Sequence, residues 1–146
     1  GTSVLVDGPY GIFTPARSDQ PVLFIAGGIG ITPFLSILKE WEAKGLSGPV
    51  VLVWSCRRFD EMIHRDFFED LQKKYQQFRF IPVATREKKE KGRIDKDLLE
   101  SVFDHSMRET ATAYICGPEP LRRSCIRILK EAGFPADKIH YEKFSS

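Results

Sequence analysis

Five short apolar runs, separated by longer amphipathic segments, constrain the fold of this chain more than any other feature of its sequence. The runs cover residues 22–26, 50–54, 78–84, 113–116 and 139–141. Short apolar runs of this kind are typical of parallel strands that are covered on both faces. The sequence therefore predicts an α/β fold, with a five-stranded parallel doubly wound (Rossmann-like) sheet and helices on both faces.

The segments between these runs have the spacing of helices and recognisable helix ends. We expect helices over residues 33–43, 60–75, 96–103 and 119–132, with Thr32 capping the first helix, Gly45 ending it and Gly133 closing the last. Residues 4–6 resemble a brief strand, and residues 7–11 a turn. No linker rich in proline, glycine or serine divides the 146 residues, so we expect one domain over residues 1–146.

Charge and cysteine content exclude several classes of function. The net charge of +2 gives no reason to expect a nucleic-acid partner, and no apolar run approaches the roughly 20 residues that span a bilayer. The three cysteines, Cys56, Cys116 and Cys125, lack the spacing of metal ligands or of a disulfide framework. We therefore expect a cytoplasmic location, with no metal site and no iron–sulfur cluster in this chain.

A glycine-rich loop follows the first predicted strand and precedes a predicted helix. Glycines let a backbone approach an anion closely, and the helix start adds free N–H groups and a positive dipole end. The loop lacks the third glycine of G-x-G-x-x-G, because Pro33 stands there, and it lacks the lysine ending of a P-loop. It predicts a pyrophosphate site rather than a triphosphatase, although a plain tight turn is the alternative. Its candidate binding residues are Gly27, Gly28, Gly30, Ile31, Thr32 and Pro33.

Guanidinium groups follow the second and third predicted strands. An NAD site usually places a carboxylate on the ribose 2′-hydroxyl, whereas arginine accommodates the 2′-phosphate of NADP. Arg57 and Arg58 therefore favour NADPH, and Asp60 and Glu61 keep NADH as the alternative. Exposed arginines that only solvate a loop would give the same pattern. The candidate residues here are Ser55, Arg57, Arg58, Thr85, Arg86 and Arg93.

All of these segments, with 116–118 after the fourth run, lie where a predicted strand ends. Ligands of doubly wound sheets bind beyond the carboxyl ends of the strands. We therefore expect one nucleotide site formed by residues 27–33, 55–58, 85–87 and 116–118, with Gly117, Pro118 and Glu119 as its last candidates. A cysteine at a strand end is more often a small buried side chain than a functional group, so packing is the alternative for Cys116.

Together these motifs resemble the NAD(P)-binding domain of the ferredoxin–NADP reductase superfamily, from residues 8–11 through the glycine loop and Cys116-Gly117-Pro118 to the terminal Glu142-Lys143-Phe144. The resemblance implies that the glycine loop holds the pyrophosphate, that Thr85-Arg86 reads a 2′-phosphate, and that Cys116 lines the hydride-transfer site. It also implies that Phe144 lies near the flavin ring and that residues 8–11 adjoin the flavin domain. Cys116 and Phe144 are thus the candidate catalytic residues.

The same resemblance implies a partner domain. An FAD-binding barrel with an Arg-x-Tyr-Ser/Thr motif is expected N-terminal to this chain, which lacks that motif and is expected to be inactive alone. Hydride would pass from NAD(P)H to the flavin, and electrons onward to haem, iron or an iron–sulfur acceptor. Residues 54–57 are somewhat similar to NADPH oxidases and ferric reductases, which would place the domain at the cytoplasmic face of a membrane. A non-catalytic NAD(P)H sensor is the alternative function, and no Gly-x-Ser-x-Gly elbow indicates a hydrolase.

Overall fold

The computed structural model describes residues 15, 19–86 and 93–142. Its centre is one sheet of five strands in the order β3-β2-β1-β4-β5, and every neighbouring pair is parallel. The strands are β1 (Val22–Gly27), β2 (Val50–Cys56), β3 (Phe78–Ala84), β4 (Thr112–Cys116) and β5 (Ile139–Glu142). The five predicted strands and the doubly wound parallel sheet are therefore confirmed.

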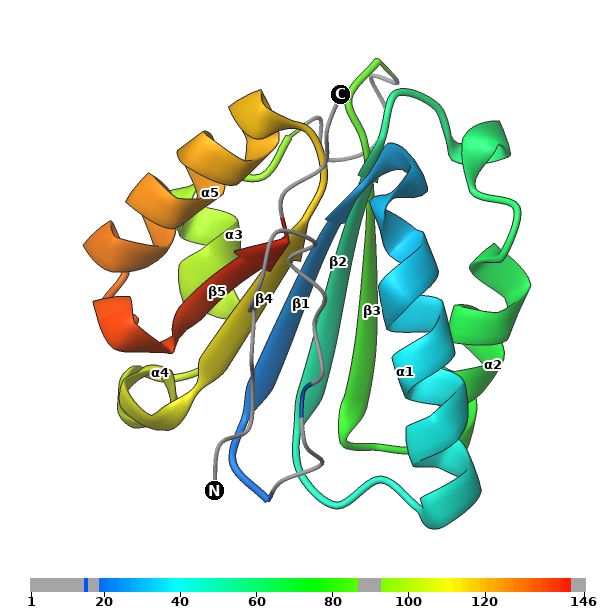
Figure 1. Cartoon of the computed structure of the whole chain (residues 1–146). Helices are drawn as coiled ribbons and strands as arrows, with labels where there is room; N and C mark the ends of the chain where they lie inside the picture. Colours follow the sequence, from blue (N-terminus) through cyan, green and yellow to red (C-terminus); the bar gives the residue numbers. More distant parts are fainter. Residues whose placement is uncertain (1–14, 16–18, 87–92, 143–146) are drawn as a thin grey trace.

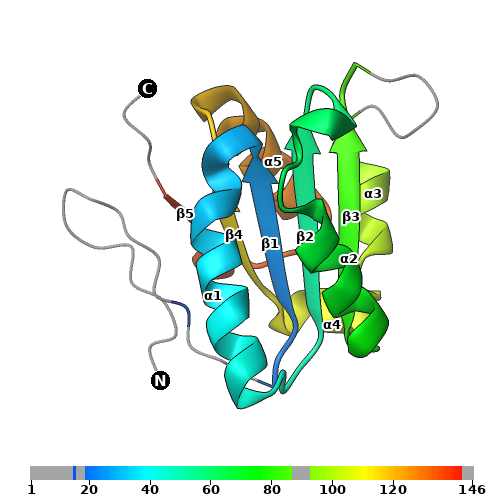
Figure 2. The same cartoon turned by 90° about the vertical axis from the view of Figure 1, so that its right-hand side faces the viewer.

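Helices cover both faces of the sheet (Figure 1). One layer holds α1 and α2 and the other holds α3 and α5, as the side view shows (Figure 2). None of the described helices is long and apolar enough to cross a membrane. The helices are α1 (Ile31–Lys44), α2 (Arg65–Lys74), α3 (Lys96–Ser101), α4 (His105–Thr110) and α5 (Glu119–Glu131).

Alternation along each strand sends successive side chains into the two layers. Phe24, Leu52 and Trp54 pack with the helices of the α1 layer, whereas Ile25 and Val53 pack with those of the α5 layer. All five are at most 1% exposed. This two-sided burial explains why the strands appear in the sequence as unbroken apolar runs, and each such side chain contributes roughly 1.5–3 kcal/mol.

The predicted cap of the first helix is wrong. The helix begins at Ile31, directly after a 3₁₀ turn, η1 (Gly28–Gly30), and its N-cap residue is Gly30, which has no side chain to cap with. Thr32 therefore lies inside the first turn, where its hydroxyl donates to the carbonyl of Ile29 at 3.1 Å. The predicted end is confirmed, because α1 stops before Gly45.

Two other helices also differ from the prediction. The segment 60–75 is not one helix: it starts with a 3₁₀ turn, η2 (Phe59–Glu61), and α2 begins only at Arg65. Between them Met62 has φ −90° and ψ 77°, and its side chain is buried in the core of the α1 layer. The segment 96–103 ends as a helix at Ser101, and α4 follows because Asp104 accepts a capping bond from the Met107 N–H. The predicted segments 4–6 and 7–11 lie outside the described residues.

The loop after β1 and the loop after β4 touch backbone to backbone. A Cβ atom on Gly30 would collide with the carbonyl oxygen of Cys116 and come within 3.2 Å of the Gly117 Cα. Both loops follow neighbouring strands at the same end of the sheet. Gly30 is therefore required by this close approach, whereas Gly28 is required by its φ of +54°.

The two glycines give a matched pair of substitutions. Gly30→Ala should lower the free energy of unfolding by about 3 kcal/mol, because the added methyl meets backbone that cannot rotate away. Gly28→Ala should cost only about 1 kcal/mol, the strain of a left-handed conformation, because no atom lies within 4 Å of its Cβ. Urea denaturation of the chain measures both values. A loss at Gly30 no larger than the loss at Gly28 would contradict the close packing of these loops.

Candidate functional site

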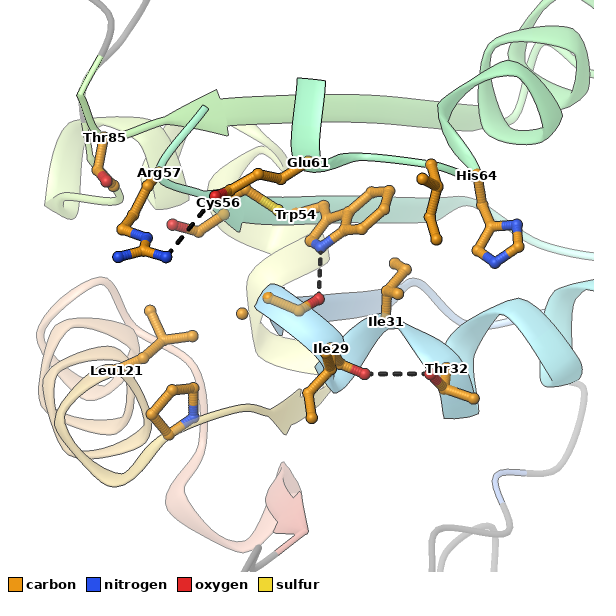
Figure 3. Close-up of a pocket in the computed structure, with 15 residues that line it drawn as sticks. Ile29, Ile31, Thr32, Trp54, Cys56, Arg57, Glu61, His64, Thr85 and Leu121 are labelled. Carbon is orange, nitrogen blue, oxygen red and sulfur yellow. Dashed lines mark hydrogen bonds and ion pairs between the residues drawn. The ribbon is translucent and has the colours of Figure 1, made fainter. Parts of the chain in front are cut away.

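A pocket of about 560 Å³ opens at the carboxyl ends of the strands (Figure 3). All four segments that the sequence placed at this edge contribute to its walls. The glycine loop and the start of α1 form one side, and the end of β2 forms another. The loops after β3 and β4, the segment before α2 and the first turn of α5 form the rest. Of the predicted binding residues, those that line the pocket are Gly27, Gly28, Ile31, Thr32, Ser55, Arg57, Thr85 and Pro118.

The glycine loop presents backbone to this pocket. Gly28 and Ile29 are exposed, and Ile31 and Thr32 at the start of α1 also line the cavity. The first N–H groups of a helix have no partner within the helix, and they carry the positive end of its dipole. The Trp54 indole N–H donates to the carbonyl of Gly28 at 2.9 Å, which ties the loop to β2. The loop and helix together form a site suited to an anion.

Arginines gather where β2 and β3 end. The hydrogen bonds between β2 and β3 continue past the ends of the strands. The Thr85 N–H donates to the backbone carbonyl of Cys56 at 2.8 Å, and the Arg86 N–H donates to that of Arg57 at 2.9 Å. Arg57 is 3.7 Å from the carboxylate of Glu61. Both side chains are exposed, and ion pairs of this kind contribute at most about 1 kcal/mol. A ligand phosphate could therefore replace Glu61 at Arg57 at little cost.

Other predicted residues do not line the pocket. Gly30 and Gly117 sit in the contact between the two loops, and Glu119 forms ion pairs with Arg122 and Arg123 on its own helix. The remaining predicted residues that do not line the pocket are Pro33, Arg58, Arg86, Arg93 and Cys116. Phe144 lies outside the described residues.

Cys116 ends β4 and contacts the last described residue of β5. Its thiol is fully buried and donates a hydrogen bond to the Glu142 carboxylate, with the sulfur 3.4 Å from the oxygen. Burial first, and then the charge and hydrogen bond of Glu142, raise the pKa of the Cys116 thiol far above its ordinary value. Cys116 therefore stays protonated at neutral pH, and a thiolate nucleophile is excluded.

Sequence reasoning missed several residues of the pocket. Trp54 was assigned only to a strand. A buried indole N–H needs an acceptor, and a strand end offers few, so this need was a signal that Trp54 contacts a neighbouring loop. Glu61 was considered only as a charge near the arginines. Ile63 and His64 were placed inside a continuous helix, and the break before α2 turns them toward the cavity. Leu121 was also missed, whereas Ile29 and Cys56 lie within the predicted segments 27–33 and 55–58 but were not named as candidates.

The strand order arranges these groups in a line along the edge. Thr85 follows β3, Ser55 and Arg57 belong to β2 and its end, the glycine loop follows β1, Cys116 ends β4 and Glu142 ends β5. Arginines thus lie at one end, a backbone anion site in the middle and a neutral thiol with its carboxylate at the other. An elongated ligand with an anionic centre fits this arrangement.

Comparison with known proteins agrees with this geometry. Residues 24–126 match the family model of the oxidoreductase NAD-binding domain, and the chain belongs to that family. It is 31% identical over 145 residues to flavohemoprotein A of Dictyostelium discoideum, covering 99% of this chain and 36% of that protein. It is 33% identical over 146 residues to the ferredoxin reductase component of 3-ketosteroid-9-alpha-monooxygenase from Rhodococcus rhodochrous, covering 100% of this chain and 40% of that protein.

A solved structure shows the same likeness. The FAD/NAD-binding domain of nitric oxide dioxygenase from Vibrio cholerae superposes with a TM-score of 0.79 at 25% identity, over 92% of this chain and 55% of that one. The chain spans less than half the length of the two curated relatives. The family resemblance expected from the motifs is therefore confirmed for the nucleotide-binding domain.

The contact between Cys116 and Glu142 predicts how a substitution of Glu142 changes the titration of the Cys116 thiol. Glu142→Gln removes the negative charge that disfavours the thiolate, so the pKa of Cys116 should fall. It should stay above that of a free thiol, because burial is the largest cause of the shift. The pH dependence of iodoacetamide labelling, resolved by mass spectrometry at Cys116, measures this change. Glu131→Gln on the exposed end of α5 is the control, and an unchanged profile in Glu142→Gln would contradict the contact.

Proposed function

We propose that this chain is the nucleotide-binding domain of an FAD-dependent NAD(P)H oxidoreductase. The observation that carries the proposal is the order of groups along the sheet edge, which matches the order of groups in a dinucleotide. The 2′-substituted adenosine would lie at the ends of β2 and β3, the pyrophosphate over the glycine loop and the nicotinamide near the ends of β4 and β5. Doubly wound sheets bind dinucleotides at this edge.

The pyrophosphate fits the loop for two reasons. The start of α1 and the exposed backbone of Gly28 and Ile29 offer N–H groups to the same cavity. Ile29, Trp54 and Leu121 contribute apolar side chains to the walls, and these side chains exclude water around those donors. Gly27 lines the pocket, and Gly30 and Pro33 are proposed to shape the loop from behind the pocket surface.

NADPH is the preferred nucleotide in this proposal. Arg57 and Arg86 are brought to adjacent positions by the continued β2–β3 ladder, and Thr85 lines the cavity beside Arg57. Guanidinium groups bind a phosphate bidentately, which a ribose hydroxyl cannot match. Glu61 lies at Arg57, where its carboxylate can accept from a ribose hydroxyl, so NADH remains a weaker substrate.

The nicotinamide end would need positioning rather than acid–base chemistry. The flavin of the partner domain, when bound, supplies the acceptor for the hydride. Cys116 contributes a small neutral thiol fixed by Glu142, and Gly117 beside it packs against Leu121 and the Gly27 backbone with no room for a side chain. Phe144 is proposed to occupy the flavin side of this end. Hydride transfer depends steeply on distance, so groups that fix the ring suffice.

The rest of the polypeptide is proposed from the relatives. Their names describe a flavohemoprotein and a ferredoxin reductase component. We propose that an FAD-binding barrel lies N-terminal to this domain and that electrons pass to a haem, iron or iron–sulfur partner. We also propose a cytoplasmic position, or the cytoplasmic face of a membrane if membrane helices lie upstream. The narrower resemblance to NADPH oxidases and ferric reductases depends on residues 54–57 alone and stays a prediction.

Calorimetric titration of the purified chain with NADPH and NADH tests the proposal. We expect binding of NADPH, weaker binding of NADH and no dye reduction without flavin. Arg86→Ala should weaken the binding of NADPH by roughly 10- to 150-fold, because one charge-assisted hydrogen bond contributes about 1.5–3 kcal/mol. It should weaken the binding of NADH by less than about twofold. Arg127→Ala on the exposed face of α5 is the control. Failure to bind either nucleotide would overturn the function, and equal losses would overturn the preference for NADPH.

A further inference from the structure

Trp54 is buried in the sheet but reaches the pocket with its polar edge. It lies on β2, is 1% exposed, and packs edge-on against Phe68 of α2 with 5.8 Å between ring centres. Its indole N–H donates to the carbonyl of Gly28, 26 residues earlier in the chain. Figure 3 shows this bond crossing from the strand to the glycine loop. The rigid ring is therefore fixed at one side and bonded to the loop at the other.

The bond sets the direction of a peptide unit in the nucleotide site. The carbonyl of Gly28 and the N–H of Ile29 belong to one planar group and point in opposite directions. Gly28 has φ +54°, and nothing lies within 4 Å of its Cβ position, so no neighbour on that side blocks a change in its conformation. Without the indole, glycine at this position could rotate its peptide at little steric cost. Trp54 is thus the group on β2 that selects one orientation.

Cys56, the next residue on that face of β2, lies against the neighbouring peptide, whose N–H belongs to Gly28. Residues 54 and 56 point to one side of the sheet, and both line the pocket. Burial, and then the charge of Glu61, raise the pKa of the Cys56 thiol to about 11, while a hydrogen bond with the Gly28 backbone acts in the opposite direction. Two side chains of β2 therefore contact the backbone of Gly28.

We propose that Trp54 is a positioning residue that holds the Gly28 peptide in the orientation that receives the dinucleotide pyrophosphate. This inference rests on the proposed function and adds a residue that acts through the loop. A role in packing alone needs only the ring, which phenylalanine also supplies in part. A role in positioning needs the N–H. Loss of the N–H should therefore weaken the binding of ligands that carry a pyrophosphate and leave the binding of other ligands unchanged.

The test compares two ligands on three versions of the chain. NADP⁺ carries the pyrophosphate, whereas 2′-AMP keeps the adenosine and the 2′-phosphate without it. Trp54→Phe should weaken the binding of NADP⁺ about three- to tenfold, which is the range for one net hydrogen bond. It should change the affinity for 2′-AMP by less than about twofold. Trp41→Phe, at the other tryptophan of the chain and 5% exposed in the α1 layer, should change neither. Calorimetry gives each dissociation constant.

The outcomes separate this inference from the proposed function. Unchanged affinity for NADP⁺, or equal loss for both ligands, would overturn the positioning role while leaving the function intact. A wild-type chain that binds neither ligand would overturn the function and the positioning role with it. If Trp54→Phe does not fold, the benzothienyl analogue at residue 54 keeps the ring shape and replaces the N–H by sulfur. The same split between the two ligands is expected from that variant, and its absence there would also overturn the role.

Discussion

The arrangement of this domain depends on the backbone contact between the loops that follow β1 and β4. Gly30 lies against the Cys116 carbonyl with no room for a side chain, so the two loops pack as one layer over the strand ends. That contact fixes where α1 begins and directs its first N–H groups at the pocket. Buried backbone of this kind cannot shift without moving two strands, so the site is rigid at its centre.

Parallel strands convert this local contact into a linear binding edge. Each strand delivers its loop to the same side, and the order β3-β2-β1-β4-β5 decides which groups become neighbours. The groups at the two ends differ in exposure: Arg57 is accessible and paired weakly, whereas Cys116 is buried and neutral. One end can exchange its partner for a ligand, and the other stays unchanged. This difference suits a dinucleotide, because its 2′ group can be a phosphate or a hydroxyl whereas its reactive ring must be placed accurately.

The sequence predicted the sheet well because each strand is buried on both faces, so its apolar run has no ambiguity. It also predicted that four segments meet at one edge, since parallel strands allow no other outcome. The cap at Thr32 and the continuous helix 60–75 were wrong, because a 3₁₀ turn precedes α1 and Met62 leaves the helical conformation to enter the core. Trp54 was missed as part of the site, since nothing in a strand pattern shows where an indole N–H finds its acceptor.

We propose that a dinucleotide binds along the carboxyl edge of the strands. Titration of the ¹⁵N-labelled chain with NADP⁺, followed by amide shifts, locates the ligand residue by residue. We expect the largest shifts from Gly27 to Thr32, with further shifts at residues 54–57 and at Thr85, and none at the opposite edge where β1 and β2 begin. Shifts centred at that opposite edge, or on the outer faces of α2 and α5, would contradict it.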